Sequence, residues 1–214
     1  MKVLVIGANG QIGKHLVTQL QNNNEHTVRA MVRKEEQLGA LKQAGIEAVV
    51  GDLEGSVDEL VKATEGCEAV IFTAGSGAHT GPDKTMLIDL DGAIKSVEAA
   101  EKAKVKRFVM VSALHRNKRE NWPDKLAHYS VAKHYADRFL QASGLNYTIL
   151  RPGGLLNEPG TGKIKAADYV VRDTIPREDV AQTAIAALNE EKTYHRAFDL
   201  VTGETEIKEA LKNI

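Results

Sequence analysis

The sequence predicts an α/β protein built on a doubly wound parallel sheet, with helices on both faces and a small C-terminal elaboration. Short apolar runs alternate with longer amphipathic stretches along most of the 214 residues, which is typical of βαβ units. Near-continuous apolar runs such as Val70-Ile71-Phe72 fit strands that are buried on both faces. Because crossovers in such sheets are right-handed, few topologies remain, and we expect the strand order 3-2-1-4-5-6.

Strands and helices are expected to alternate through the first half of the chain. Ile12, Leu16 and Leu20 recur at helical spacing, with polar residues between them, so they mark the first helix. The expected strands are 3–6, 27–33, 46–50 and 68–73, and the expected helices are 11–23, 35–44, 57–64 and 82–104.

The second half begins in the same way and then changes texture. We expect strands at 105–111 and 147–150, with a helix over 125–142 between them. Residues 153–175 are rich in glycine and charge and contain one short expected strand near 169–171. The remaining expected elements are a helix at 177–188, a strand at 198–201 and a helix at 206–212. Because no linker separates this part, we expect one domain over 1–214, in which 153–214 forms a small substrate-side region.

Composition and charge exclude several classes of protein. Lys plus Arg total 28 and Asp plus Glu total 29, so the net charge of −1 provides no field for gripping nucleic acid or a membrane. The single cysteine, Cys67, cannot form an internal disulfide, and no Cys/His spacing predicts a metal site. Val3 to Ile6 is too short for a secretory core, and no apolar run approaches the roughly 20 residues of a membrane span. We expect a cytoplasmic protein.

A glycine-rich motif, Gly7-Ala-Asn-Gly10-Gln-Ile-Gly13, follows the first expected strand and opens the first expected helix. Glycines let the backbone approach a pyrophosphate, and the helix N-terminus supplies N–H groups and a positive dipole end. The alternative is a glycine-rich turn without a ligand, which the strand–turn–helix context disfavours. The motif predicts a Rossmann-type dinucleotide site with these contact residues: Gly7, Asn9, Gly10, Gln11, Ile12 and Gly13.

The end of the second expected strand bears on the choice between NAD and NADP. An acidic residue there would bind the ribose 2′-hydroxyl, but the sequence has Arg33 and Lys34. A basic residue suits a 2′-phosphate, and the planar guanidinium of arginine suits it best. These residues predict a preference for NADP(H) over NAD(H). The alternative is a solvated charge at a strand end, and Glu35 and Glu36 soften the preference.

Small and polar residues follow the third and fourth expected strands at the same edge of the sheet. Asp52 is expected to accept a hydrogen bond from the adenine amino group, with Leu53 packed on the ring. A turn or N-cap aspartate is an equally good interpretation of Asp52. Thr73, Ala74 and Gly75 leave room for the nicotinamide half near the switch point between the first and fourth strands.

Three residues form a candidate catalytic group: Ser112, Tyr129 and Lys133. Tyr129 and Lys133 are four residues apart on one expected helix, so they share a face. A nearby ammonium favours the phenolate form of a tyrosine, which suits proton transfer at neutral pH. The alternative is an ordinary exposed tyrosine and lysine on an amphipathic helix.

Several motifs together carry a family resemblance that covers essentially the whole chain. They are Gly7-Ala-Asn-Gly10-Gln-Ile-Gly13, Asp52-Leu53, Val111-Ser112, Tyr129-Ser-Val-Ala-Lys133, Tyr147-Thr-Ile-Leu-Arg-Pro-Gly153 and Ile175-Pro-Arg-Glu-Asp-Val180. The chain resembles the atypical short-chain dehydrogenase/reductase superfamily, and more closely its small bacterial NAD(P)-binding members, often called sugar-epimerase-like. The resemblance implies that Tyr129 is the acid/base and that Lys133 binds the nicotinamide ribose. It also implies that Pro152, Gly153 and Leu155 border the nicotinamide.

The sequence departs from this family at two points. Sugar-modifying relatives usually carry a catalytic Ser or Thr two residues beyond Ser112, where this chain has Leu114. This departure argues against a full Ser–Tyr–Lys triad. The region after Pro152 is also shorter than the lobe of full-size sugar-nucleotide epimerases, which makes a nucleotide-sugar substrate less favoured.

The basic segment His115-Arg-Asn-Lys-Arg-Glu-Asn-Trp122 has two interpretations. It is either a solvated surface loop, which we favour, or a lid that recognises an anionic substrate with Trp122 stacked on it.

Three functions are compatible with these motifs. The first is an NADP(H)-dependent oxidoreductase that acts on a small carbonyl, flavin-like or quinone-like compound. The second is a non-catalytic NADP(H) sensor that controls a protein partner, as NmrA-like members of the superfamily are thought to do. The third is a nucleotide-sugar epimerase or dehydratase. The sequence predicts no nucleic-acid or membrane partner.

Overall fold

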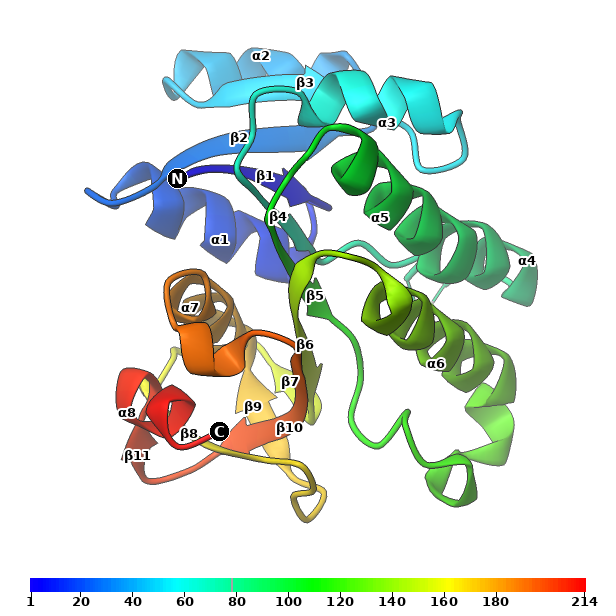
Figure 1. Ribbon diagram of the computed structural model, residues 1–214, viewed down its shortest axis with the longest axis vertical. Helices are drawn as coiled ribbons and strands as arrows, with labels where there is room; N and C mark the ends of the chain where they lie inside the picture. The colour runs from blue at the N-terminus through cyan, green and yellow to red at the C-terminus, as the bar shows by residue number, and fades with distance from the viewer. Residues whose placement is uncertain (78) are drawn as a thin grey trace.

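One large sheet organises the fold, in the strand order β11-β8-β10-β6-β5-β4-β1-β2-β3 (Figure 1). The computed structural model describes residues 1–77 and 79–214. The six strands from β3 to β6 pair in parallel and confirm the order 3-2-1-4-5-6. Their bounds are β1 Lys2–Ile6, β2 Thr27–Val32, β3 Glu47–Val50, β4 Ala69–Phe72, β5 Arg107–Val111 and β6 Asn146–Pro152.

The C-terminal elaboration extends this sheet beyond β6. The strand β10 (Arg196–Thr202) pairs in parallel with β6. The strands β8 (Lys163–Ala167) and β11 (Thr205–Glu206) complete the edge in antiparallel pairs. A separate two-stranded sheet, β7 (Gly154–Leu156) with β9 (Thr174–Pro176), was not expected from the sequence.

The expected strand near 169–171 is wrong. The strand of this region is β8, which ends at Ala167, and its Ile164 is fully buried against the sheet. Tyr169 is 50% exposed and Val171 is 74% exposed. Val170 between them is 1% exposed and packs with Leu114 and Val201. The tripeptide is therefore a loop segment after β8 that buries one side chain, and an alternation of apolar residues over three positions does not distinguish such a segment from a strand.

Helices cover both faces of the sheet, as expected. The helices α1 (Gln11–Gln21), α7 (Arg177–Ala187) and α8 (Ile207–Lys212) bury their apolar residues in one core, and α2 (Glu36–Gln43) lies at its margin. The helices α3 (Val57–Thr64), α5 (Ala93–Lys102) and α6 (Ala127–Ala142) line the other core. Along β1, Val3 and Val5 enter the first core while Leu4 and Ile6 enter the second, because successive strand residues point to opposite faces.

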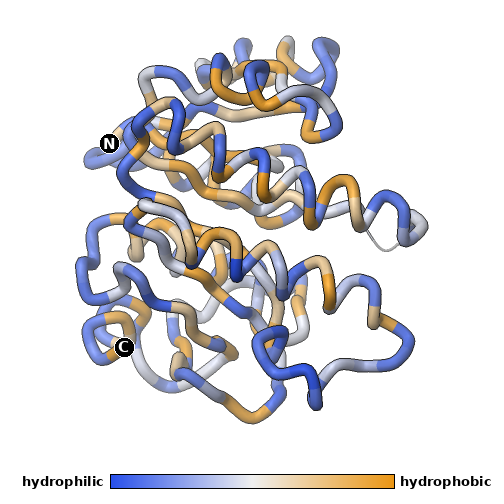
Figure 2. The backbone as a smooth tube through the Cα atoms, turned by 45° about the vertical axis from the view of Figure 1, so that its right-hand side comes forward, coloured by the Kyte–Doolittle hydropathy of each residue, from blue (hydrophilic) through white to orange (hydrophobic). Residues whose placement is uncertain are grey.

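Figure 2 shows apolar segments running through the inside of the fold and polar segments along the loops. None of the helices in the described part of the chain is long and apolar enough to cross a lipid bilayer.

The long helix expected over 82–104 contains a distortion. A short helix, α4 (Pro82–Lys84), leads into a π-helical segment, η1 (Thr85–Gly92), which continues as α5. A π-helix widens the turn and shifts the direction in which side chains project, and it is often found at functional sites. Here the segment carries the buried carboxylate of Asp89, which is 1% exposed.

Candidate functional site

The three motif glycines bring backbone segments into close contact at the carboxyl end of β1. Gly7 has a φ of +89°, in the left-handed region that favours glycine. A Cβ atom on Gly7 would lie 2.7 Å from the backbone nitrogen of Ala74, so the loop after β1 touches the loop after β4. A Cβ atom on Gly13 would overlap the Gly7 carbonyl oxygen. The glycines therefore allow α1 to start directly against the loop.

The N-terminus of α1 has no side-chain cap. Its N-cap residue is Gly10, and its first turn contains no acidic residue. In contrast, Ser56 and Glu59 form a full capping box at the start of α3. The first N–H groups of a helix need an acceptor, and a phosphate at an uncapped N-terminus provides one. The uncapped helix and the glycine cradle fit the pyrophosphate of a dinucleotide.

Of the other predicted loop residues, Asn9, Gly10 and Gln11 are exposed and Ile12 is buried, and their contacts with a dinucleotide stay a prediction.

Two predicted cofactor residues follow adjacent strand ends. The N–H of Gly51 donates to Val32 O at 3.0 Å, which holds the ends of β2 and β3 together. Arg33 is exposed, and its side chain makes no hydrogen bond or ion pair within the described residues. The neighbouring Lys34 is also exposed, and its backbone N–H donates a hydrogen bond to Gln37 Oε1 at 3.0 Å.

Asp52 is a turn aspartate: its Oδ1 accepts the Glu54 N–H at 2.9 Å. Its side chain remains exposed, so its predicted contact with adenine stays a prediction. Leu53 is 9% exposed and packs in the core near Gly92, so little of its side chain is left to face a ring.

The loop after β4 is fixed by Asp89. Thr73 N–H donates to Ile6 O at 3.0 Å and continues the pairing of β1 with β4. Beyond Ala74 and the exposed Gly75, the N–H of Ser76 donates to Asp89 Oδ2 at 2.9 Å. The carboxylate of η1 therefore holds the segment where the nicotinamide half was predicted to lie.

The other oxygen of Asp89 binds Lys133. The Lys133 Nζ lies 3.2 Å from Asp89 Oδ1 and 5.7 Å from the centre of the Tyr129 ring. Burial disfavours the ammonium, but neighbouring Tyr129 and Asp89 outweigh this effect and raise the pKa of Lys133 above its ordinary value. The structure therefore brings Tyr129 and Lys133 together on the inner face of α6, with the lysine in its charged form.

The third predicted catalytic residue lies deeper. Ser112 is 5% exposed, and its hydroxyl has no hydrogen-bond partner among the described residues. Leu114, which replaces the second hydroxyl of sugar-modifying relatives, is also buried. The end of β5 thus presents no hydroxyl at the surface beside Tyr129.

The residues predicted to border the nicotinamide form the start of the C-terminal region. Pro152 ends β6, and its carbonyl accepts the Leu114 N–H at 3.0 Å. Gly153 packs so closely that a Cβ atom would overlap the Asp173 carbonyl oxygen. Leu155, on β7, is 36% exposed.

A second buried ion pair lies one turn further along α6. Arg151 Nε donates to Asp137 Oδ2 at 2.9 Å, and both side chains are buried. Burial raises the pKa of Asp137, although Arg151 opposes the shift. Asp89, Asp137 and Arg151 were not identified as site residues from the sequence. Helical spacing could have pointed to Asp137, because it follows Lys133 by four residues on the same face of the helix.

The basic segment after β5 divides into a buried and an exposed part. His115 and Arg116 are buried, whereas Arg119 is exposed. Trp122 Nε1 donates to Arg116 O at 3.2 Å, and the indole meets the His134 ring edge-on at 5.4 Å. The tryptophan is therefore anchored on α6, and the segment is more than a solvated loop.

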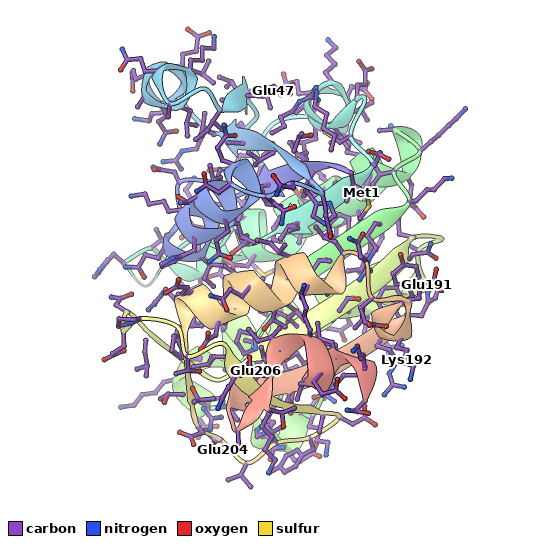
Figure 3. All side chains as sticks on the ribbon, turned by 90° about the vertical axis from the view of Figure 1, so that its left-hand side faces the viewer. Met1, Glu47, Glu191, Lys192, Glu204 and Glu206 are labelled. Atoms are coloured by element: carbon purple, nitrogen blue, oxygen red, sulfur yellow. The ribbon has the colours of Figure 1, made fainter. Side chains whose placement is uncertain are left out.

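Two cavities lie away from the glycine loop. One, of about 310 Å³, is lined by residues of α6 and β10 and includes Asp137 and Arg151. The other, of about 840 Å³, lies beside α7 and α8, and Glu206, which lines it, is labelled in Figure 3. No group of side chains suited to hold a metal ion occurs within residues 1–77 and 79–214.

Fold and site together define a Rossmann-type NAD(P)-binding protein, and comparison with known proteins gives its family. Residues 7–191 match the family described as NAD(P)H-binding, and the chain belongs to that family. The uncharacterized sugar epimerase YhfK of Bacillus subtilis (strain 168) is 60% identical over the full length of both chains. The predicted resemblance to NAD(P)-binding, epimerase-like proteins is confirmed.

Solved structures agree over the whole chain. A Bacillus halodurans protein with the provisional name NAD-dependent epimerase/dehydratase superposes with a TM-score of 0.93 at 41% identity, covering 100% of both chains. The oxidoreductase ylbE of Lactococcus lactis superposes with a TM-score of 0.90 at 33% identity, covering 100% of this chain and 96% of that one.

Replacement of Gly13 by alanine tests the close packing of α1 on the loop. The added Cβ would overlap the Gly7 carbonyl, so we expect Gly13→Ala to lower the free energy of unfolding by about 1–3 kcal/mol. Gly39→Ala in α2 is the matched control, because no atom lies within 4 Å of its Cβ position, and it should stabilise by up to about 1 kcal/mol. Urea denaturation measures both variants, and equal effects would contradict the packing.

Replacement of Asp89 by asparagine tests the buried ion pair. Asp89→Asn leaves the Lys133 ammonium buried without its counter-charge, so we expect a loss of about 3 kcal/mol in the free energy of unfolding. The control is Asp91→Asn, which breaks the pair with Lys95 at a side chain that is 52% exposed and should cost at most about 0.5 kcal/mol. A loss of the same small size in both variants would show that the Asp89 pair does not support the fold.

Proposed function

We propose that the protein is an NADP(H)-dependent oxidoreductase that acts on a small carbonyl, flavin-like or quinone-like compound. The observation that carries the proposal is the link from the glycine loop to the tyrosine. Gly7 packs on Ala74, Asp89 binds both Ser76 and Lys133, and Lys133 lies 5.7 Å from the Tyr129 ring. A group with proton-transfer chemistry is thereby fixed beside the loop that suits a dinucleotide.

The chain offers groups that suit the phosphates and the adenine end of the cofactor. Backbone N–H groups at the start of α1 suit the pyrophosphate, and the exposed guanidinium of Arg33, with Lys34 beside it, suits a 2′-phosphate. Asp52 lies at the edge where adenine is expected. When bound, NADP(H) supplies the hydride, and the protein supplies position and electrostatics.

Tyr129 is the proposed proton donor. Its hydroxyl makes no hydrogen bond within the described part of the chain, so it is available to a substrate oxygen. Lys133 remains an ammonium because its pKa is raised, and its charge stabilises the phenolate that forms when the proton leaves. Tyr129 Oη therefore donates a proton to the substrate oxygen as the substrate is reduced. The oxidoreductase name of the Lactococcus lactis relative supports this reaction class.

A non-catalytic NADP(H) sensor that controls a protein partner is the second candidate. The observation that favours it is the absence of a surface hydroxyl at the described end of β5, where Ser112 and Leu114 are both buried. A nucleotide-sugar epimerase or dehydratase is less favoured, because residues 153–214 supply only five strands of two to seven residues, two α-helices and one 3-10 turn for a substrate.

Cofactor choice depends on Arg33 in this proposal. We expect wild-type protein to bind NADPH more tightly than NADH, and Arg33→Ala to weaken NADPH binding by roughly tenfold or more with little effect on NADH. The measurement is a fluorescence titration with each cofactor, and Lys42→Ala, at an exposed position of α2, is the control. Equal dissociation constants for the two cofactors in both wild type and Arg33→Ala would remove the 2′-phosphate role.

Turnover depends on the Tyr129 hydroxyl in this proposal. In a screen of quinones and small carbonyl compounds with NADPH, Tyr129→Phe should abolish turnover and leave NADPH affinity nearly unchanged, because only the proton donor is lost. Tyr135→Phe is the matched control on the same helix, since that ring is 45% exposed and its hydroxyl accepts from Arg119. Normal turnover by Tyr129→Phe would sink the assignment. Binding of NADPH without turnover of any compound would favour the sensor.

A further inference from the structure

One buried arginine has no partner in the described part of the protein. Arg116 is 5% exposed, and its Nε and Nη1 atoms are buried without a hydrogen bond in the described residues. No carboxylate of the described chain forms an ion pair with it. A buried charge without a partner is unfavourable by several kcal/mol, in the order of magnitude seen when buried pairs are broken.

The backbone around Arg116 is held firmly. Its carbonyl oxygen accepts from Trp122 Nε1 at 3.2 Å and lies 2.9 Å from His134 Nδ1. The preceding His115 has a φ of +59°, and its Nε2 lies 2.8 Å from Val170 O. His115 also stacks on Tyr169, with ring centres 4.6 Å apart. These contacts fix the backbone on both sides of Arg116, so the fold determines where this side chain starts.

The guanidinium lies beside the proposed proton donor. Its Cζ is 5.7 Å from the centre of the Tyr129 ring, the same distance as Lys133 Nζ. Burial lowers the pKa of Arg116, and the nearby Arg172 charge lowers it further, although Tyr129 opposes the shift. An arginine still keeps its proton under such conditions, so positive charge accumulates at this side of the tyrosine. The contact with an aromatic ring contributes only about 1 kcal/mol, which does not offset the missing partner.

We propose that Arg116 is the receptor for an oxyanion of the substrate, a carboxylate or a phosphate, placed next to Tyr129. The inference rests on the proposed function and adds to it the substrate class: a reducible compound that carries an anionic group. A guanidinium presents its N–H groups as a planar fork that matches carboxylate and phosphate oxygens. Such a group would supply the partner that Arg116 lacks in the described chain. A neutral substrate would leave the buried guanidinium without one.

Matched acids and amides test the receptor directly. The probes are benzoate and phenylacetate, their primary amides, and inorganic phosphate, titrated calorimetrically into the full-length protein with and without NADP⁺. We expect at least one acid to bind tenfold or more tightly than its amide to wild type, and this preference to fall below twofold in Arg116→Met. The control Arg119→Met removes an exposed charge from the same segment and should keep the preference. Binding of phosphate, but of neither acid, would assign the site to phosphate esters.

Stability separates a receptor from a structural arginine. Since Arg116 has no partner in the described chain, Arg116→Met should melt at the same temperature as wild type or higher, whereas loss of a structural charge would lower it. No preference for anions across the panel, or a preference that survives Arg116→Met, would overturn the inference. Failure to bind NADP⁺ would instead overturn the proposed function, and the titrations without cofactor would still decide the role of Arg116.

Discussion

The carboxylate of Asp89 joins parts of the site that are far apart in the sequence. One oxygen accepts the N–H of Ser76 in the loop after β4, and the other binds Lys133 on α6. Because the pair is buried, each partner needs the other, and neither the loop nor the lysine can move without exposing an uncompensated charge. Asp89 lies on the buried side of the π-helical segment η1, together with Thr85 and Gly92. The position of Tyr129, four residues before Lys133 on the same helix, follows from that pair.

The sheet order supplies the rest of the geometry. β1 and β4 are parallel neighbours, so their carboxyl ends lie side by side. Successive strands are added on one side of β1 up to β3 and on the other side from β4 onward, and ligands bind at this switch point in such folds. The absence of a Cβ at Gly7 lets the two loops touch, and the absence of a Cβ at Gly13 lets α1 begin there. The loop after β4 therefore connects the uncapped start of α1 with the Asp89–Lys133 pair. The match of residues 7–191 to an NAD(P)H-binding family agrees with a cofactor site at this edge of the sheet.

Local patterns were enough to predict most of this fold but not its charge network. The bounds of α3 were predicted to the residue, and the order of the six parallel strands was confirmed, because apolar runs and helical spacing report burial directly. The strand near 169–171 was wrong because these residues form a loop after β8 in which only Val170 is buried. Asp89 was missed as a site residue, and Arg116 was considered only as part of a basic segment, with a solvated loop favoured over an anion-binding lid. A buried charge has no local signature, because its partner, or the lack of one, depends on elements distant in sequence.

Two cationic side chains lie at the same distance from the Tyr129 ring but differ in their partners. Lys133 forms an ion pair with Asp89, whereas Arg116 has no acidic partner in the described protein. This asymmetry suits a site completed by a cofactor and an anionic substrate. Binding of the dinucleotide at the carboxyl edge of β1 and β4 underlies every functional step, and hydrogen–deuterium exchange with and without NADP⁺ tests it. Exchange should slow in residues 7–14 and 73–76 when NADP⁺ is present. Unchanged exchange there, or slowing confined to the residues around the 310 Å³ cavity, would contradict this placement.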